Sequence, residues 1–555
     1  MNKKEFFKQR IDKIAKESFN ADQKELAKKI IDNTEDKDLD AVWGFISQRV
    51  KTGFVFDEAP DINHDCVAYI KENEKLGINV GKENSVEHSL IIGENYDALK
   101  NLVATYTDKQ GNGLIDIIYI DPPYNTDKSK EEGNDYKENI EGKSKFIYRD
   151  KYTRDGWLNM MNERLKLAKK LLKDDGFILI SINDTEQAYL RVLCDDIFGE
   201  ENFIENFIWV KNSGGSLSKT TLTRHEHIIC FAKNKEKSYE STFYLMEKPG
   251  YKDVIKIIEK CKGEGKNTTQ AQEILNRFYR EHPELKGISL YSNIDSNYRV
   301  YRTLPITAPN NLFYDVLHPI TGKPVQTPPR GWSWSMETMD KNIKEGRVIF
   351  GKDETYGIAQ KLLLDDAKFE HKRSTFLCDQ AEGNKILQAI FGAVNIFENP
   401  KPISLLYFLL QNTSKSSIIL DFFAGSGTTG QAVMELNEED GGKRKFILVT
   451  NNENNIATKI TRERLYRVIN GKGSKGEEFE WTYSKDKKCL NNNALRVFNI
   501  VKENLNITDI DKAEKIKKEA ESNFIKLNPN YNTKSDLDIY NVLSSLTPYK
   551  DESED

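Results

Sequence analysis

Two short apolar segments, each followed at once by an unusual turn, constrain the fold of this chain more than any other feature. Residues 417–423 form an apolar run typical of a buried parallel strand, and closely spaced glycines follow at Gly425, Gly427 and Gly430. Residues 431–436 then predict a helix. Because glycine allows a sharp turn and close approach of a ligand, this order predicts the nucleotide-binding half of a doubly wound sheet.

The glycine turn by itself leaves its ligand open. A P-loop requires a lysine directly after its second glycine, and Gln431 stands in that position. A dinucleotide-binding turn and a plain tight turn remain alternatives, since Gly-x-Gly after a strand is a weak signal. Glu453 follows the next expected strand, residues 446–450. An acid there can accept hydrogen bonds from ribose hydroxyls, which serves NAD and S-adenosylmethionine alike.

The second apolar segment, residues 114–120, leads into Asp121-Pro122-Pro123-Tyr124. Open α/β sheets place their chemistry at the carboxyl ends of strands, which is the position of Asp121. Each proline fixes φ, lacks an N–H group and disfavours helical geometry for the residue before it. The motif therefore predicts a stiff, extended corner rich in acceptors, although proline clusters standing alone are usually simple turns.

Such a corner suits the exocyclic amino group of a nucleic-acid base. The Asp121 carboxylate and the Pro122 carbonyl can accept the two amino hydrogens, which localises the nitrogen lone pair. A preorganised carboxylate also stabilises the positive charge that grows on the nitrogen during methyl transfer. Tyr124 can stack on the base, which must be flipped out of a duplex to become accessible. Together with the glycine turn, this corner predicts methylation of a base by S-adenosylmethionine.

With these motifs the chain resembles the β-class amino-methyltransferases, and specifically the modification (Mod) subunits of type III restriction-modification systems. The resemblance spans roughly residues 88–455 and includes Asn125 and Thr126 after the corner. It also covers residues 399–406 and 89–99, where Glu94 replaces the usual aspartate. The cofactor-binding residues that it implies, with Glu453 added, are Asp421, Phe423, Gly425, Gly427, Glu453, Glu94, Asn95 and Lys401.

The resemblance implies a sequence-specific DNA adenine-N6 methyltransferase of the bacterial cytoplasm. Its cofactor is S-adenosylmethionine, and its substrate is double-stranded DNA with one flipped adenine. It further implies a homodimer and a separate nuclease-helicase (restriction) subunit. Two alternatives stay open: an enzyme with another acceptor or setting (cytosine N4, RNA, or a solitary DNA methyltransferase), and a non-catalytic DNA-specificity subunit. The recognition sequence does not follow from these residues.

The expected fold class is α/β, a doubly wound Rossmann-like methyltransferase sheet with an inserted target-recognition domain and helical N- and C-terminal regions. Residues 127–150 predict a mobile loop near the substrate. The expected parts are a helical region at 1–85, a catalytic half at 86–233, the target-recognition domain at 234–395, a cofactor-binding half at 396–484 and a helical region at 485–555.

DNA binding must use a local basic surface, because the net charge of the chain is −5. Residues 205–235 carry a charge of +3 and supply Lys211 and Lys219. In the insert, arginines can read guanine edges or grip phosphate, and aromatic rings can stack on unpaired bases. The candidates there are Arg299, Arg302, Arg330 and Trp332, with a solvated strand and a packed loop as the plain alternatives.

Metal binding and membrane insertion are not expected. His225 and His227 suggest a metal, but no cysteine or second histidine pair completes a site, and alternation along a strand explains them better. The six cysteines are scattered without a Cys-x-x-Cys pair, which is typical of reduced thiols in a cytosolic protein. We find no signal peptide and no apolar run of spanning length.

Overall fold

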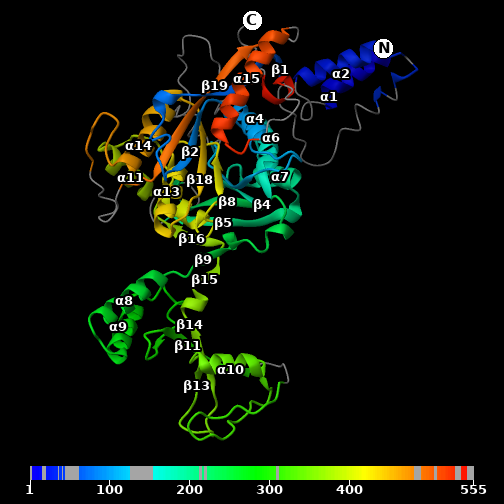
Figure 1. The fold of residues 1–555 in the computed structure, drawn as a ribbon. Helices are drawn as coiled ribbons and strands as arrows, with labels where there is room; N and C mark the ends of the chain where they lie inside the picture. Colours follow the sequence, from blue (N-terminus) through cyan, green and yellow to red (C-terminus); the bar gives the residue numbers. More distant parts are fainter. Residues whose placement is uncertain are drawn as a thin grey trace.

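The chain forms a body around a large sheet, an extension that projects from this body, and a separate helix pair near the N-terminus (Figure 1). This arrangement is seen in a computed structural model. The residues that it describes are 3–14, 21–35, 37–39, 42–43, 62–124, 154–211, 216–217, 222–307, 312–479, 489–505, 509–531 and 539–546. No described helix is long and apolar enough to cross a membrane.

The body is built on an 11-stranded sheet. In order across the sheet, its strands are β16 (Thr375–Cys378), β5 (Phe203–Lys211), β8 (His225–Ala232), β4 (Leu172–Ile182), β3 (Ile115–Ile120), β17 (Ile418–Asp421), β18 (Lys445–Thr450), β2 (Val86–Ile92), β19 (Asn493–Asn504), β1 (Ile62–Glu72) and β20 (Ser544–Leu546). From β4 to β19 neighbouring strands are parallel. In contrast, β8 is antiparallel to both of its neighbours, and β1 to β19 and β20.

Helices cover both faces of the sheet. One face carries α4 (Asn95–Thr105), α6 (Arg154–Leu171), α7 (Gln187–Phe198), α15 (Ile510–Leu527) and α16 (Ile539–Leu543). The other carries α11 (Ala381–Phe391), α12 (Ile403–Leu410), α13 (Thr428–Asp440) and α14 (Arg462–Asn470). Ile118 of β3 packs in the first core and Ile117 in the second, which is why a strand buried on both faces is continuously apolar. The predicted doubly wound α/β fold is confirmed.

The two ends of the chain differ from the helical regions expected at 1–85 and 485–555. At the N-terminal end, α1 (Lys3–Ile14) and α2 (Ala21–Asn33) are helical, with a small core of their own. However, β1, β19 and β20 lengthen the central sheet beyond β2. Without them β2 would be an open edge with unpaired backbone groups. Both ends therefore carry the expected helices, but they also add strands that the sequence did not predict, because these strands find their partners far away in the sequence.

The insert between β8 and β16 joins the body through a ladder of β9 (Leu245–Glu247) and β15 (Phe369–His371) (Figure 1). It contains α8 (Tyr251–Gly263), α9 (Thr268–Glu281), α10 (Met336–Lys344) and a sheet of β10 (Asn293–Ile294), β11 (Val300–Pro305), β14 (Ala359–Leu363) and β13 (Val348–Ile349). Two small hydrophobic clusters form its core. The range 234–395 expected for this unit includes β16 and α11, which pack in the body.

Between β5 and β8 lies a small ladder of β6 (Ser216–Leu217) and β7 (Leu222–Thr223).

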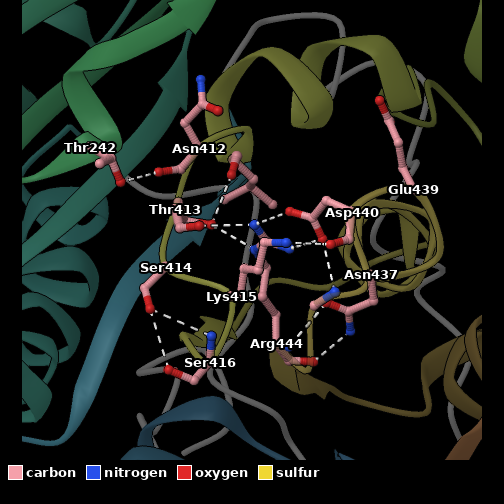
Figure 2. A network of polar contacts seen from close by, with 12 residues as sticks. Thr242, Asn412, Thr413, Ser414, Lys415, Ser416, Asn437, Glu439, Asp440 and Arg444 are labelled. Atoms are coloured by element: carbon pink, nitrogen blue, oxygen red, sulfur yellow. Dashed lines mark hydrogen bonds and ion pairs between the residues drawn. The ribbon is translucent and has the colours of Figure 1, made fainter.

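A buried arginine holds the amino-terminal ends of β17 and β18 together (Figure 2). Arg444 donates to the hydroxyl and the carbonyl of Thr413 at 3.0 and 2.8 Å, and it forms a bidentate pair with Asp440 at 3.0 and 2.8 Å. The side chain of Asn437 exchanges hydrogen bonds with the Arg444 backbone at 2.8 and 2.9 Å. This Arg444 clamp (Thr413, Asn437, Asp440 and Arg444) connects the chain before β17, the end of α13 and the chain before β18.

Candidate active site

The two motifs of the sequence meet at one edge of the sheet. Strands β3 and β17 are parallel neighbours, with Ile117 opposite Ile419 and Ile118 opposite Leu420. Their carboxyl ends therefore place Asp121 and the glycine turn side by side. The helix after β17, α13, lies on one face and the helix after β3, α6, on the other. Such a switch point is where open α/β sheets bind their ligands.

Four further polar side chains gather around Asp121, and we call this group the Lys401 cluster (Asp121, Tyr124, Lys211, Glu226 and Lys401). Nζ of Lys401 lies 3.0 Å from Oδ1 of Asp121, and it donates to the Tyr124 hydroxyl at 2.7 Å and to Glu226 at 3.2 Å. The Tyr124 hydroxyl donates to Glu226 at 3.0 Å. Lys211 donates to the other oxygen of Glu226 at 2.6 Å. Both carboxylates thus have a lysine beside them.

The acidity of the cluster follows from burial and from these pairs. Burial raises the pKa of Asp121 above its usual range, although Lys401 opposes the rise. Burial would also raise the pKa of Glu226, but Lys401 and Lys211 outweigh it and the pKa is lowered. For Lys401, burial is outweighed by Asp121 and Glu226, so its pKa is raised. Oδ1 of Asp121 is buried and faces Nζ of Lys401 at 3.0 Å, but this ion pair lacks hydrogen-bond geometry, so the oxygen can still accept from a donor.

Neighbouring side chains hold the Asp-Pro-Pro-Tyr corner in place. The indole N–H of Trp157, a fully buried residue of α6, donates to the carbonyl of Pro123 at 2.8 Å. The Tyr124 ring lies under Lys401, with Nζ at 4.7 Å from its centroid. Burial, together with Asp121 and Glu226, raises the pKa of the Tyr124 hydroxyl well above its usual value, so it is a neutral donor. The predicted stiff corner is thus held by side chains from α6, β8 and the segment before α12.

The glycine turn needs its glycines. Gly425 has φ of 48° and Gly427 has φ of 77°, both in the left-handed region. A Cβ atom on Gly427 would lie 3.1 Å from Thr461. Asp421 shapes the turn, because its carboxylate accepts from the backbone N–H of Phe423 at 3.0 Å and from the hydroxyl of Thr429 at 2.5 Å. Burial raises the pKa of Asp421 to about 7, although both hydrogen bonds oppose the rise.

Glu94 and Asn95 brace this turn. The Glu94 carboxylate caps α4 by accepting from Tyr96 N–H at 2.6 Å, and it pairs with Arg164 at 2.5 Å. Asn95 donates to the Phe422 carbonyl at 3.0 Å and accepts from Arg164 at 2.5 Å. Only 3% of the Glu94 side chain is exposed, and its contacts with α4 and Arg164 are structural; its contact with the cofactor stays a prediction. The sequence did not single out Arg164, which stabilises both side chains.

Of the other cofactor candidates, some lie near the glycine turn and one lies at the Asp121 corner. Glu453 follows β18 and is half-buried, and its contact with a ribose stays a prediction. Phe423 is half-buried within the turn. Lys401 lies at the Asp-Pro-Pro-Tyr corner, beside Asp121 and Tyr124, and its contact with the cofactor stays a prediction. Glu226, which we did not predict, completes that corner; its sequence signal is an acid between two histidines at the start of an apolar strand.

The arginine and tryptophan candidates in the insert have different environments. Trp332 is a core residue whose indole N–H donates to the Tyr314 carbonyl at 2.9 Å, so its ring is not available to stack on a base. Arg299 pairs with Asp295 at 2.7 Å. Arg302 is half-buried, and its guanidinium lies 5.4 Å from the Tyr291 ring centroid. Arg330 is exposed and remains a candidate for DNA contact.

Two lysines of the basic surface expected at residues 205–235 are paired with acids. Lys211 neutralises Glu226 inside the Lys401 cluster, where 12% of its side chain is exposed. Lys233 pairs with Asp174 at 3.3 Å. Lys219 and the loop predicted at 127–150 lie outside the described residues.

Comparison with known proteins assigns the family. The chain belongs to the DNA methylase family, whose model matches residues 115–462. Residues 4–112 also match a family described as an uncharacterised conserved protein.

Three curated relatives are similar over most of the chain. The EcoP15I Mod subunit of a type III restriction-modification enzyme, from Escherichia coli, is 31% identical over 70% of this chain and 64% of its own length. The StyLTI Mod subunit from Salmonella typhimurium is 31% identical over 74% of this chain and 59% of its own. The type II methyltransferase M.KpnI from Klebsiella pneumoniae is 30% identical over 70% and 87%. The chain therefore spans less than two thirds of either Mod subunit.

Proposed function

We propose that this chain transfers a methyl group from S-adenosylmethionine to N6 of adenine in double-stranded DNA, as the modification subunit of a type III restriction-modification system in the bacterial cytoplasm. One observation carries the proposal. The Asp121 carboxylate stands beside the glycine turn in a chain of the DNA methylase family, and its buried Oδ1 is ion-paired with Lys401 without hydrogen-bond geometry, so it can accept from a substrate. The chain's resemblance to Mod subunits supports the type III assignment.

The Lys401 cluster has the properties that the acceptor reaction needs. Asp121 and the Pro122 carbonyl accept the amino hydrogens of a flipped adenine, and Asp121 stabilises the charge that develops on the nitrogen. Because burial disfavours the ionised form of Asp121, the nearby Lys401 keeps the carboxylate available as an acceptor. Glu226 in turn holds Lys401 and the Tyr124 hydroxyl, so the Tyr124 ring is positioned for stacking. We assign Lys401 and Glu226 as positioning residues.

The glycine turn fits S-adenosylmethionine. Gly425 and Gly427 have no side chains to block the turn, and α13 begins at Thr428 without a side-chain cap, which leaves N–H groups for a ligand carboxylate. Glu453 can accept from ribose hydroxyls. When bound, this cofactor supplies a methyl group on a positively charged sulfur.

Product analysis tests the proposal directly. The purified chain is incubated with double-stranded DNA and S-adenosylmethionine labelled on the methyl group, and the DNA is then hydrolysed to nucleosides. We expect label in N6-methyladenine. Label in N4-methylcytosine or transfer only to RNA would contradict the acceptor, and no transfer with intact cofactor binding would favour a non-catalytic specificity subunit.

A second experiment separates a type III subunit from a solitary methyltransferase. The chain is expressed in cells with and without a restriction partner, and the methylated positions in their DNA are sequenced. The similarity to M.KpnI favours the solitary enzyme as the second candidate.

We also propose that the insert reads the DNA sequence. The catalytic corner holds one flipped base, so neighbouring base edges must be read from elsewhere. The insert has its own cores and a two-strand connection, which supports its exchange as a unit. Replacing residues 248–368, between β9 and β15, with the equivalent segment of a related subunit should change the methylated sequence and keep adenine as the acceptor. A folded chimera that methylates the original sequence would refute this role.

A homodimer with a separate nuclease-helicase subunit completes the proposal. The N-terminal helix pair supports an assembly role, because Phe6, Leu26 and Ile30 are exposed apolar side chains on α1 and α2. Light scattering at micromolar concentration should give the mass of a dimer. Replacing Leu26 and Ile30 with serine should shift the mass toward a monomer, and a monomer in the unmodified chain would contradict the proposal.

A further inference from the structure

Three side chains of types that bind metal ions gather where β4 ends and β8 begins, on the strand that also carries Glu226 of the Lys401 cluster. Asp184 follows β4, and His225 and His227 start β8. Oδ1 of Asp184 is 2.8 Å from Nε2 of His227 and 3.5 Å from Nε2 of His225. The three ligand atoms all lie within 4.8 Å of one another. The sequence showed the two histidines but not the third ligand, because Asp184 reaches them only through the pairing of β4 with β8.

The spacing of the three ligand atoms fits tetrahedral coordination of a metal ion. Bonds of about 2.0–2.1 Å from a zinc ion to nitrogen and oxygen place tetrahedral ligand atoms about 3.3 Å apart. The two measured separations from Asp184 lie on either side of that value. Two imidazoles and one carboxylate are a ligand set that suits zinc and its neighbours Fe²⁺, Co²⁺ and Ni²⁺.

A second observation concerns the orientation of His227. Its Nδ1 lies 3.0 Å from the side-chain amide nitrogen of Asn206, while Oδ1 of Asn206 is buried and has no hydrogen-bond partner among the described residues. Since no other contact fixes the amide, it can turn its oxygen toward the ring. Asn206 then accepts from Nδ1–H, and the lone pair of Nε2 points toward Asp184. Metal-binding histidines are oriented by a hydrogen bond of this kind on their other nitrogen.

We propose that Asp184, His225 and His227 form a binding site for a divalent transition-metal ion of the zinc type, with Asn206 orienting His227. Three protein ligands leave one coordination position for water or another small ligand. The ion would fasten the chain after β4 to the first residues of β8. Glu226 lies between the two histidines and, by the alternation of a strand, points to the opposite face, toward Lys401. The site therefore stabilises the strand that carries Glu226 without taking part in methyl transfer.

Metal titration of the full chain tests the site. After chelator treatment and dialysis, Co²⁺ is added and followed by visible absorption, and Zn²⁺ binding is measured by calorimetry. We expect one ion per chain with nitrogen and oxygen ligands. Binding should be lost in His225→Ala, His227→Ala and Asp184→Asn, and weakened about 10- to 100-fold in Asn206→Ala. His282→Gln, a half-buried histidine of the insert, is the matched control and should bind like the unmodified chain.

Stability provides an independent readout. Zn²⁺ should raise the thermal midpoint of the unmodified chain and of His282→Gln, but not of Asp184→Asn, in which an exposed carboxylate is replaced without disturbing the core. Circular dichroism confirms that each variant is folded. Three outcomes would each overturn the proposal. They are metal binding that survives in the histidine variants, a sulfur-to-cobalt charge-transfer band that assigns the ion to cysteines, and the absence of stoichiometric binding.

Discussion

The Arg444 clamp and the Lys401 cluster are two buried groups of charges near opposite ends of the parallel strands, and they differ in how completely their polar atoms are paired. In the clamp, Arg444 donates to a hydroxyl, a carbonyl and both oxygens of Asp440. In the cluster, Oδ1 of Asp121 is ion-paired with Lys401 at 3.0 Å, but this contact lacks hydrogen-bond geometry, so the oxygen is less completely paired than the atoms of the clamp.

This difference separates a structural role from a chemical one. A fully paired buried charge is costly to disturb and has no capacity left for a ligand. An incompletely paired carboxylate costs stability in the folded state but can accept a donor from a substrate. Substitution should therefore damage mainly folding at the clamp and mainly turnover at the cluster, and the following predictions test that distinction.

The largest effect is expected at the clamp. Arg444→Leu leaves Asp440 and the Thr413 carbonyl without their partner, and loss of one member of a buried pair costs about 3–5 kcal/mol. One third of the Asp440 side chain is exposed, at 34%, so we expect a value near the lower end. Urea unfolding of the body measures the loss. The exposed Arg280→Leu is the control and should stay within about 0.5 kcal/mol. A large fall in methyl transfer per folded molecule would contradict a structural role.

Next in size is the effect expected at Asp121, the proposed catalytic carboxylate. Asp121→Ala should slow methyl transfer about 100- to 1,000-fold, or about 2.7–4 kcal/mol, because an electrostatic stabiliser of the developing charge is removed. S-adenosylmethionine affinity by calorimetry should be almost unchanged, since Asp121 faces the acceptor. The urea midpoint should also change little. Turnover near that of the unmodified chain would remove Asp121 from the active site.

A smaller effect is expected at Tyr124. Tyr124→Ala should weaken capture of the flipped base by about 1–3 kcal/mol, the usual contribution of base–aromatic stacking. A 2-aminopurine at the target position should report less extrusion, with duplex affinity affected less. Tyr124→Phe is the matched control: it removes the hydrogen bonds with Lys401 and Glu226 but keeps the ring. Equal extrusion in the alanine variant and the unmodified chain would refute stacking.

The smallest net effect is expected at Asp421, and it depends on pH. Burial raises its pKa from 3.8 to about 7, so the folded state holds this proton more tightly than the unfolded state. The stability that it contributes is fully present below pH 3.8 and is lost as the pH rises to about 7. Asp421→Asn removes this dependence but weakens hydrogen bonds to Phe423 and Thr429, which limits the gain.

Thermal midpoints against pH measure this last effect. The difference between Asp421→Asn and the unmodified chain should shift in favour of the variant as the pH rises to about 7 and then level off. Parallel profiles across that interval would show that Asp421 does not titrate near neutrality.

Local sequence patterns were sufficient for the strands and turns that carry the chemistry. Residues 114–120 and 417–423 are continuously apolar because strands in the middle of a parallel sheet are buried on both faces. The positive φ angles of Gly425 and Gly427 also follow from a local requirement, since few other residues tolerate them. The α/β class and the DNA methylase family were therefore available from the sequence alone.

Pairings between distant segments were decided by the tertiary structure. Lys211 was predicted to contact DNA, but the antiparallel pairing of β5 with β8 places it against Glu226. Trp332 was predicted to stack on a base, but it is a core residue of the insert. Composition does not distinguish a basic or aromatic side chain at the surface from one that is paired or buried.

The sequence by itself determined which elements form and which motif ends each of them, because these depend on residues close together in the chain. Only the tertiary structure decided that Glu226 and Lys401 surround Asp121, that Arg164 supports Glu94 and Asn95, and that Asp184 joins His225 and His227. Each of these groups combines side chains from different strands or helices. Their charges acquire their pKa values and partners only when folding removes them from water and brings them within a few ångströms of one another.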